Sequence, residues 1–378
     1  MRITIIGGGP AGLYFALLMK QQDPGHAVTL IERDGPDDTF GWGIVFSDQT
    51  FDYLRDSDVP SFERITAACE KWDNVDIVHR GECISVRGNR FSGIARITFL
   101  RVLQDRCREL GVDLRFHHPV TSLDDLPPRD LLVGADGANS LVRRAHESVF
   151  RPTVGHGRNK YIWLGTRRLF HGLTLTFVQH ETGLFTAHSY KFDRHTSTFI
   201  VECSEETWRN AALDRKGEAE TCRFLEAVFT DHLQGHPLLA KNFLRWLNFP
   251  LVQNARWHGE SIVLLGDALH TAHFSIGSGT KLALEDAIVL AGACAAEPGP
   301  ARALPLFEAT RRSRVEQYQQ AALDSLHWFE DVGDHMHLDP LPFAVEAMTR
   351  SRRVDVEKLR QRDPVFVDAY EGWSRSHG

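Results

Sequence analysis

The first thirty-two residues alternate between apolar runs and a glycine-rich break. Arg2 to Ile6 is a short run of mostly β-branched residues, which predicts a buried strand. Three glycines follow, and after them apolar residues recur at helical spacing (Leu13, Ala16, Leu17). The stretch "AVTLIER" then predicts a second strand that ends at Glu32. Strand, helix and strand in this order predict a parallel unit at the start of an α/β domain.

The middle of the chain has a different pattern. "KYIWLGTRRLF", "LTLTFVQHE", "GLFTAHSYKF" and "TSTFIVECS" are β-rich runs separated by turn residues, which predicts an antiparallel sheet of at least four strands. "EETWRNAAL" and "AETCRFLEAVFTDHL" predict helices, with Ser204 as an N-cap. After Pro298 a long amphipathic helical pattern begins, and the last part of the chain is helical and charged.

Composition narrows the class of protein. The 378 residues are 42% hydrophobic and 25% charged, which is typical of a globular chain with a sizeable core. The formal net charge of −7 gives no indication of nucleic-acid binding. The six cysteines form no C-x-x-C pair, which favours a reducing compartment. With no signal-peptide pattern and no apolar run of membrane-spanning length, we expect a cytoplasmic protein with no membrane contact.

The glycine break fits a dinucleotide fingerprint. Gly7, Gly9 and Gly12 form G-x-G-x-x-G directly after a strand and before a helix, and Glu32 ends the next strand. Glycines let the backbone approach a pyrophosphate, the helix N-terminus supplies N–H groups, and the acid accepts a ribose hydroxyl. The alternative is a glycine turn without a ligand. The residues expected to contact the cofactor here are Gly7, Gly9, Pro10, Ala11, Gly12, Glu32 and Arg33.

Two later segments point to a flavin. "DLLVGADGANSLVRR" and "GDALHTAHFSIGSGTKLALEDA" resemble the DG and GD motifs of the FAD-dependent aromatic hydroxylases (group A flavoprotein monooxygenases), in the order of that family. The resemblance implies FAD, with NADPH or NADH as co-substrate. It implies that the GD motif wraps the ribityl chain and the flavin, and that an arginine lies near the FAD diphosphate. The residues so implied are Arg96, Asp136, Gly266, Asp267, Gly277, Gly279 and Thr280.

The chain departs from the family pattern at two places. His273-Phe274 stands where the family usually has Pro-Pro, and Lys281 stands where it usually has Asn. His273 is therefore either a catalytic group near the reacting ring or a hydrogen-bonding group within the loop. His270 and His273 could also be metal ligands, but no third ligand follows at metal spacing, so we expect no metal. We expect His270 to be structural.

The resemblance also implies a substrate pocket between the middle sheet and the flavin domain. His188 is a second candidate base, beside His273. Each aromatic residue of this region has an alternative interpretation, since strand alternation also buries such residues in a sheet core. The residues expected to contact the substrate are Trp42, Phe46, Trp163, Phe185, Tyr190 and Phe274.

Taken together, the expected fold is α/β: a discontinuous Rossmann-like FAD-binding domain (1–155 and 256–335), an inserted antiparallel β-sheet substrate domain (156–255) and a C-terminal helical segment (336–378). Several stretches, among them "GRNKYIWLGT" and "SGTKLALEDA", resemble the branch of salicylyl-CoA 5-hydroxylase, 2-aminobenzoyl-CoA monooxygenase and the tryptophan-derivative hydroxylase of the violacein pathway.

The branch implies a single-component monooxygenase that hydroxylates an electron-rich ring through a C4a-hydroperoxyflavin. The substrate it implies is a small aromatic, foremost a CoA-activated 2-hydroxy- or 2-aminobenzoate, and the second substrate is O2. The alternatives are a hydroxylase of a tryptophan- or indole-derived intermediate, and a non-hydroxylating flavin oxidase or reductase. Arginine pairs at 167–168, 311–312 and 352–353 are candidates for binding CoA phosphates. We expect a monomer or homodimer.

Overall fold

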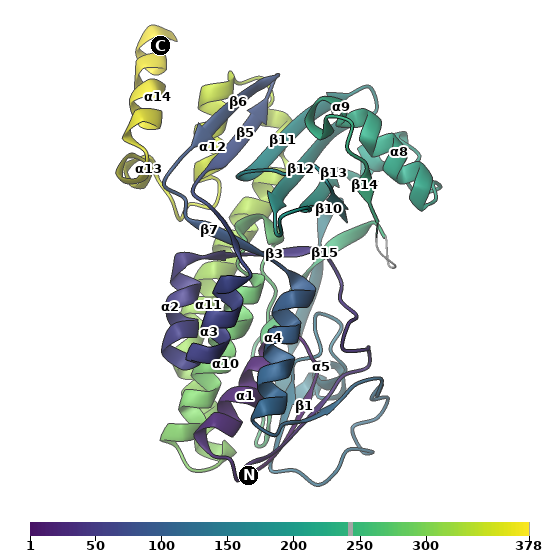
Figure 1. The fold of residues 1–378 in the computed structure, drawn as a ribbon, viewed down its shortest axis with the longest axis vertical. Helices are drawn as coiled ribbons and strands as arrows, with labels where there is room; N and C mark the ends of the chain where they lie inside the picture. Colours follow the sequence, from purple (N-terminus) through teal and green to yellow (C-terminus); the bar gives the residue numbers. More distant parts are fainter. Residues whose placement is uncertain (241–244, 378) are drawn as a thin grey trace.

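A five-stranded parallel sheet forms the lower half of the molecule in the computed structural model, which describes residues 1–240 and 245–377 (Figure 1). Ile3 pairs with Val28 on one side and with Leu131 on the other, so the first strand lies at the centre. Its side chains are buried on both faces, as expected for a parallel sheet covered by helices. The strand order is β16 (Ile262–Leu264), β9 (Leu131–Gly134), β1 (Arg2–Ile6), β2 (Ala27–Ile31) and β8 (Asp113–Arg115).

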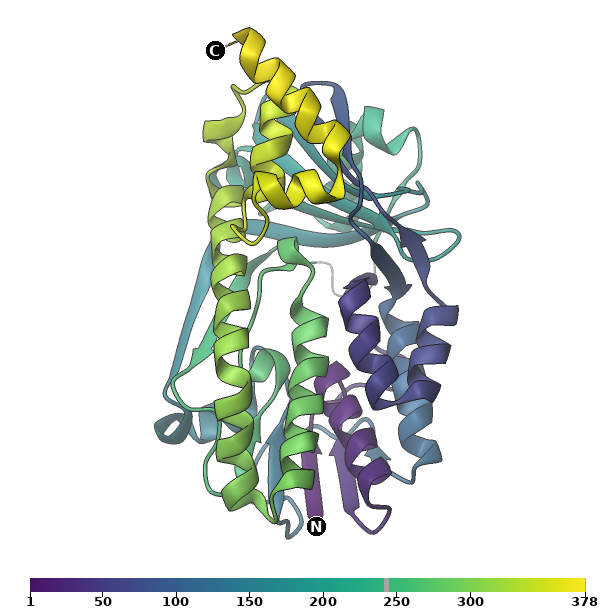
Figure 2. The same ribbon diagram turned by 90° about the vertical axis from the view of Figure 1, so that its left-hand side faces the viewer.

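Helices pack around this sheet and bury its apolar side chains. α1 (Pro10–Gln22) packs between α4 (Arg96–Glu109) and α10 (Gly279–Ala296). The short helices α5 (Leu141–Ala145) and α6 (Glu147–Phe150) follow β9. α11 (Pro300–Glu330) packs on α10 and continues from the lower half up to the level of the upper sheet, as Figure 2 shows.

A larger mixed sheet forms the upper half. β10 (Pro152–Thr166), β13 (Ser197–Cys203), β12 (Gly183–Lys191) and β11 (Leu173–His180) are antiparallel neighbours, and they are the four β-rich runs of the sequence. On the outer face of the sheet Phe199 and its neighbours pack against the helical region. That region is α7 (Glu205–Asn210), α8 (Glu218–Val228) and α9 (Thr230–Leu233); β14 (Leu238–Leu239) and β15 (Leu247–Asn254) both pair with β10.

This upper sheet draws on more of the chain than the range 156–255. β5 (Val75–His79) pairs in parallel with β11, and β6 (Glu82–Val86) pairs with β5, so a hairpin from the N-terminal third extends the sheet. β10 also begins at Pro152, ahead of that range. The strands of 75–86 are short, and their place became evident only from the pairing with β11.

A small third sheet lies between the two halves. β7 (Phe91–Ala95) pairs with β3 (Gly43–Ser47) and β4 (Glu70–Trp72), and α2 (Asp48–Ser57) and α3 (Val59–Ala67) follow β3 (Figure 1). At the C-terminus α12 (Pro340–Thr349) packs on β5 and β6, and α13 (Val356–Arg362) and α14 (Pro364–His377) follow. Among the described residues, no helix is long and apolar enough to cross a membrane.

Candidate FAD-binding and aromatic site

Steric contacts explain two glycines of the β1–α1 turn, and open space surrounds a third. Gly7 has φ +110°, and a Cβ atom there would lie 2.2 Å from the carbonyl oxygen of Ala135. A Cβ on Gly12 would lie 2.1 Å from the carbonyl oxygen of Gly7, so this glycine lets the helix pack on the turn. A Cβ on Gly9 would meet no atom within 4 Å. Gly9, Pro10 and Ala11 border a cavity of about 700 Å³, so open space adjoins the turn.

The acid at the end of β2 holds this turn. One oxygen of Glu32 accepts the N–H of Gly8 at 2.6 Å, and the other accepts the N–H of Asp34 at 2.9 Å. The neighbouring Arg33 is exposed, pairs with Asp34 at 3.0 Å and does not border the cavity. The structure therefore brings Glu32 to the glycine turn, and neither Glu32 nor Arg33 borders the cavity.

The GD segment supplies the opposite wall. It follows β16 as two short 3-10 turns, η1 (Gly266–Ala268) and η2 (Phe274–Ile276), and then enters α10. Gly266 and Gly277 have φ +58° and +60°, and Gly279 and Thr280 form the first turn of α10 on the cavity wall. Among the described residues no side chain caps this helix end. Its N–H groups and its positive dipole end are therefore available to an anionic ligand.

Arg96 and Asp267 both border the cavity, and each influences the charge of the other. Arg96 begins α4, and its Nε donates to Thr39 Oγ1 at 3.0 Å. Burial lowers the pKa of Arg96, an effect that Asp267 and Tyr190 oppose. Burial likewise raises the pKa of Asp267, and Arg96 opposes that effect. Both side chains border the cavity, so an anion and a hydroxyl of one ligand have partners there.

Asp136 is used differently from the expectation of a direct cofactor contact. Its carboxylate accepts the Ser140 hydroxyl at 2.5 Å and the N–H of Leu141 at 2.6 Å, and so caps α5. Its neighbours Ala135 and Gly137, not Asp136 itself, border the cavity. The DG aspartate thus fixes the backbone that faces the ligand.

The other end of the cavity lies against the upper sheet. Trp163 on β10, His188 and Tyr190 on β12, and Phe274 of η2 all border it. The hydroxyl of Tyr190 donates to the carbonyl of Gly43 at 2.9 Å, and burial raises its pKa. Phe249 of β15 also borders the cavity. This end is therefore mostly aromatic.

Three residues expected to contact the substrate lie elsewhere. Phe185 is fully buried on the outer face of the sheet, because it is an odd number of residues from His188 and strand side chains alternate. Phe46 is fully buried between Phe51 and Phe99. Trp42 packs on Phe192, with rings 6.4 Å apart, and against the backbone of Gly165. None of the three borders the cavity.

His188 is paired with a buried acid that the sequence analysis missed. Its Nε2 lies 3.2 Å from Glu202 on β13, and Asn159 donates to the other carboxylate oxygen at 2.9 Å. Burial alone would raise the pKa of Glu202, but His188 and the nearby His273 outweigh it, and the pKa is lowered. The Nδ1 atom of His188 has no protein partner in the described structure and is not sealed from solvent. A glutamate within the apolar run "FIVEC" was the signal that could have identified this pair.

His273 does not reach the cavity. It is 3% exposed, its Nδ1 lies 2.8 Å from Ser275 Oγ, and Phe274 stands on the cavity side. The chain of contacts continues from Ser275 to Ser325 and then to Arg350. Burial lowers the pKa of His273 to about 4. This placement matches the hydrogen-bonding alternative for the loop.

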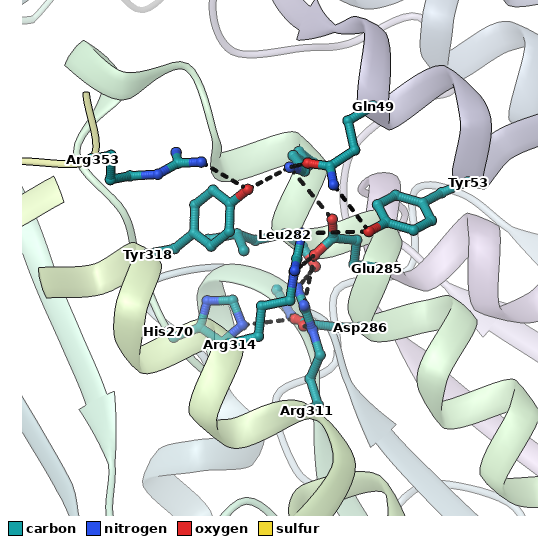
Figure 3. A network of polar contacts seen from close by, with 12 residues as sticks. Gln49, Tyr53, His270, Leu282, Glu285, Asp286, Arg311, Arg314, Tyr318 and Arg353 are labelled. Carbon is teal, nitrogen blue, oxygen red and sulfur yellow. Dashed lines mark hydrogen bonds and ion pairs between the residues drawn. The ribbon is translucent and has the colours of Figure 1, made fainter. Parts of the chain in front are cut away.

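His270 belongs to a buried charge network behind the GD loop. Its Nε2 lies 2.8 Å from Asp286, which also accepts Arg311 at 2.8 Å (Figure 3). Burial would raise the pKa of Asp286, but His270 and Arg311 lower it to about 2. In the same network Lys281 donates to Gln49 at 2.8 Å and to the Tyr318 hydroxyl at 2.5 Å. Among the described residues no group of His, Cys, Asp and Glu side chains could hold a metal ion.

Comparison with known proteins agrees with this arrangement. A family model described as an FAD binding domain matches residues 1–126. Salicyloyl-CoA 5-hydroxylase from Streptomyces sp is 39% identical over 388 residues, covering 100% of this chain and 74% of that protein. Protodeoxyviolaceinate monooxygenase from Chromobacterium violaceum is 37% identical, covering 91% and 92%.

The name of a third relative describes a substrate ring bound to a carrier protein. It is 3-hydroxy-4-methyl-anthranilyl-[aryl-carrier protein] 5-monooxygenase from Streptosporangium sibiricum, 36% identical over 88% of this chain and 90% of that protein. Among solved structures, 2-methyl-3-hydroxypyridine-5-carboxylic acid oxygenase has the same fold, with a TM-score of 0.72 over 96% of this chain and 97% of that one at 18% identity. The chain belongs to the FAD-dependent aromatic monooxygenases, in the branch that contains the three relatives.

Proposed function

We propose that this flavoprotein monooxygenase takes its electrons from NADPH or NADH and hydroxylates a 2-hydroxy- or 2-aminobenzoyl ring carried as a CoA thioester. The name of one relative gives a salicyloyl group on CoA, and the name of another gives an anthranilyl group on an aryl-carrier protein. The observation that carries the proposal is one cavity that joins a glycine-lined wall to an aromatic sheet face. A second candidate is an indole-derived substrate, which the 37% identity to protodeoxyviolaceinate monooxygenase favours.

The residues present fit FAD. Gly9, Gly277 and Gly279 are open positions where an added Cβ would meet no atom within 4 Å, so the backbone can lie against a ligand. In this proposal the two uncapped helix ends and Arg96 hold the diphosphate and flavin, and Asp267 accepts a ribityl hydroxyl. Glu32 lies behind the glycine turn and would accept ribose hydroxyls with the lone pairs that the N–H groups of Gly8 and Asp34 leave free. Bound FAD would supply the reduction of oxygen and its transfer to the ring.

The aromatic end would hold the ring of the substrate. Trp163, Tyr190 and Phe274 offer flat apolar surface, and the buried walls exclude water from the reaction. A ring activated by an ortho hydroxyl or amino group must lose a proton as the new bond forms. We assign the role of accepting this proton to Nδ1 of His188.

Glu202 acts here as a positioning residue. Because its carboxylate accepts the Nε2–H of His188, it selects the tautomer in which Nδ1 is free to accept a proton. The lowered pKa keeps Glu202 charged, so it also stabilises the imidazolium that forms. His273 would orient the loop that carries Phe274 and touch no reacting atom.

Anaerobic stopped-flow reduction of the bound flavin tests this function. NADPH and NADH are each mixed with the holoenzyme in the presence of salicyloyl-CoA, 2-aminobenzoyl-CoA, the free acids, tryptophan or an indole-derived compound. We expect the CoA thioesters to accelerate flavin reduction and to yield hydroxylated product when oxygen is admitted. Acceleration and product with the indole-derived compound alone would replace the proposal by the second candidate. No product with any compound of the panel would contradict both.

A further inference from the structure

The charges around the cavity are unlike those of the whole chain. The chain has a formal net charge of −7. Among the described residues that border the cavity, six are basic and two, Asp48 and Asp267, are acidic; the basic ones are Arg90, Arg96, Lys281, Arg350, Arg353 and Arg362. Arg96 and Asp267 influence each other electrostatically at the glycine-lined end of the cavity, where we propose that FAD binds (the FAD end). That leaves five cations and one carboxylate for the rest of the wall.

Three of the five cations outside the FAD end lie at the opening of the cavity. Arg90, Arg353 and Arg362 are exposed and border the cavity, so they lie where it meets solvent, whereas Lys281 is only 4% exposed and lies inside. Arg90 comes from the β6–β7 connection, and Arg353 and Arg362 come from the C-terminal segment. Segments far apart in the chain therefore converge on this opening.

Two of these arginines are held in place without a carboxylate. The guanidinium of Arg353 stacks 4.1 Å from the Tyr318 ring centre and donates to its hydroxyl at 3.1 Å, a contact visible in Figure 3. Arg362 donates to Asn89 Oδ1 at 3.1 Å. Within the part of the chain that the structure describes, neither forms an ion pair. Nearby Arg360, in contrast, pairs with Asp368 at 2.8 Å.

A path of positive charge leads inward from the opening. The Tyr318 hydroxyl joins Arg353 to Lys281. Burial would raise the pKa of Tyr318, but Lys281 and Arg353 outweigh it and the pKa is lowered. Lys281 lies 3.7 Å from Glu285 and Arg90 lies 3.8 Å from Asp48, whereas Arg353 and Arg362 have no carboxylate partner among the described residues. Arginines without a carboxylate partner at the mouth of a cavity favour an anionic ligand, and arginine forks match phosphate oxygens.

We propose that Arg353 and Arg362, with Arg90 beside them, bind the phosphate groups of a nucleotide tail whose other end enters the cavity. The proposal rests on the proposed function for its favoured source, the nucleotide part of a CoA thioester, with the aromatic ring at the sheet end. NADPH carries the same phosphate chemistry. Of the three arginine pairs in the sequence, only 352–353 contributes to this opening, through Arg353; Arg311 is buried in the charge network.

The first test is direct binding, which does not depend on turnover. The probe is adenosine 3′,5′-bisphosphate, titrated into the holoenzyme by calorimetry. We expect the wild type to bind it, Arg353→Ala and Arg362→Ala each to weaken binding about tenfold, and the double variant about a hundredfold, the size expected for charge-assisted hydrogen bonds. The matched control is Arg352→Asn, which removes the adjacent charge outside the cavity; asparagine tolerates its φ of +56°. Equal binding by wild type and double variant would overturn the proposal.

The second test separates the two sources of phosphate. It compares kcat/KM for salicyloyl-CoA with that for its N-acetylcysteamine thioester, which has no phosphate, and measures flavin reduction against NADPH concentration. If the arginines bind the phosphates of the CoA substrate, the double variant loses its preference for the CoA thioester. If they bind the phosphates of NADPH, the NADPH concentration that gives half-maximal flavin reduction rises instead. If the double variant shows neither change, the proposal is overturned. Failure of the wild type to hydroxylate either thioester would count against the proposed function and leave the bisphosphate result intact.

Discussion

The glycine-lined end of the cavity, where we propose that FAD binds, is built mainly from backbone, and the aromatic end is built from side chains. At the FAD end there are glycine turns and two helix N-termini. Each turn or helix end presents the N–H groups of consecutive residues. At the aromatic end, Trp163, His188 and Phe274 come from three separate segments. A backbone surface is set by a local motif, whereas a side-chain surface depends on strand register and on distant partners. The two ends should therefore respond differently to substitution.

The largest effect is expected at the glycine turn. Substitutions at Gly7 and Gly9, two residues apart, should affect stability and FAD affinity respectively. Gly7→Ala forces a residue with φ +110° against the Ala135 carbonyl, and we expect a loss of about 3 kcal/mol or more in unfolding free energy. Gly9→Ala adds a Cβ that meets no protein atom, so its fold is expected to persist while FAD affinity falls at least about tenfold. Chemical denaturation and FAD titration measure both. Wild-type FAD affinity in Gly9→Ala would show that the cofactor does not lie against this turn.

The second effect concerns the aromatic end and its proton acceptor. We expect His188→Asn to lower kcat about 10²- to 10³-fold, the usual share of a general base. Glu202→Gln should lower kcat about tenfold and move the acid limb of the pH profile to lower pH, because an amide stabilises an imidazolium less than a carboxylate does. A purely structural Glu202 would leave that limb in place, and this outcome would exclude its positioning role.

The third effect is the pH dependence of stability that the buried His273 should cause. His273 has a pKa of about 4 in the folded protein against 6.5 when unfolded, because burial disfavours its charged form. Below about pH 6.5 the unfolded chain binds a proton there that the folded protein does not, so stability falls as the pH drops toward 4. We expect a loss of about 3 kcal/mol over this interval. Denaturation curves at pH 7, 6, 5 and 4 should show a smaller loss of unfolding free energy for His273→Asn than for the wild type. If the unfolding free energy falls equally steeply with pH in both proteins, His273 is not the group responsible.

The smallest effect compares two phenylalanines under the same substitution. Phe274→Leu should raise KM for the aromatic substrate several-fold, because this ring borders the cavity. Phe185→Leu should instead cost about 1 kcal/mol of stability, because its ring is buried on the outer face of the sheet. Steady-state kinetics and thermal unfolding measure the pair. A higher KM in Phe185→Leu would break the distinction between the two faces of the sheet.

The sequence was informative where function depends on local geometry. The β1–α1 turn, the GD loop and the four strands of the upper sheet could all be predicted, because turn glycines and alternation are short-range signals. Parity within β12 also separates Phe185 from His188 and Tyr190, and counting along the strand would have excluded it.

The rest depended on contacts between distant segments. Glu202 acquires its role only because β13 pairs with β12 and brings it to His188. Arg353 and Arg362 reach the cavity only because the C-terminal segment folds back on the β6–β7 connection. Asp136 follows the family motif in sequence, yet a helix end nearby takes up its hydrogen bonds. No local pattern distinguishes such arginines or aspartates from ordinary surface residues.

The most direct test of the account is isotope incorporation. The holoenzyme is supplied with NADPH, ¹⁸O₂ and either salicyloyl-CoA or 2-aminobenzoyl-CoA, and the product is analysed by mass spectrometry. The account predicts one ¹⁸O atom on the aromatic ring. Oxidation of NADPH that releases only peroxide and leaves both rings unlabelled would contradict it.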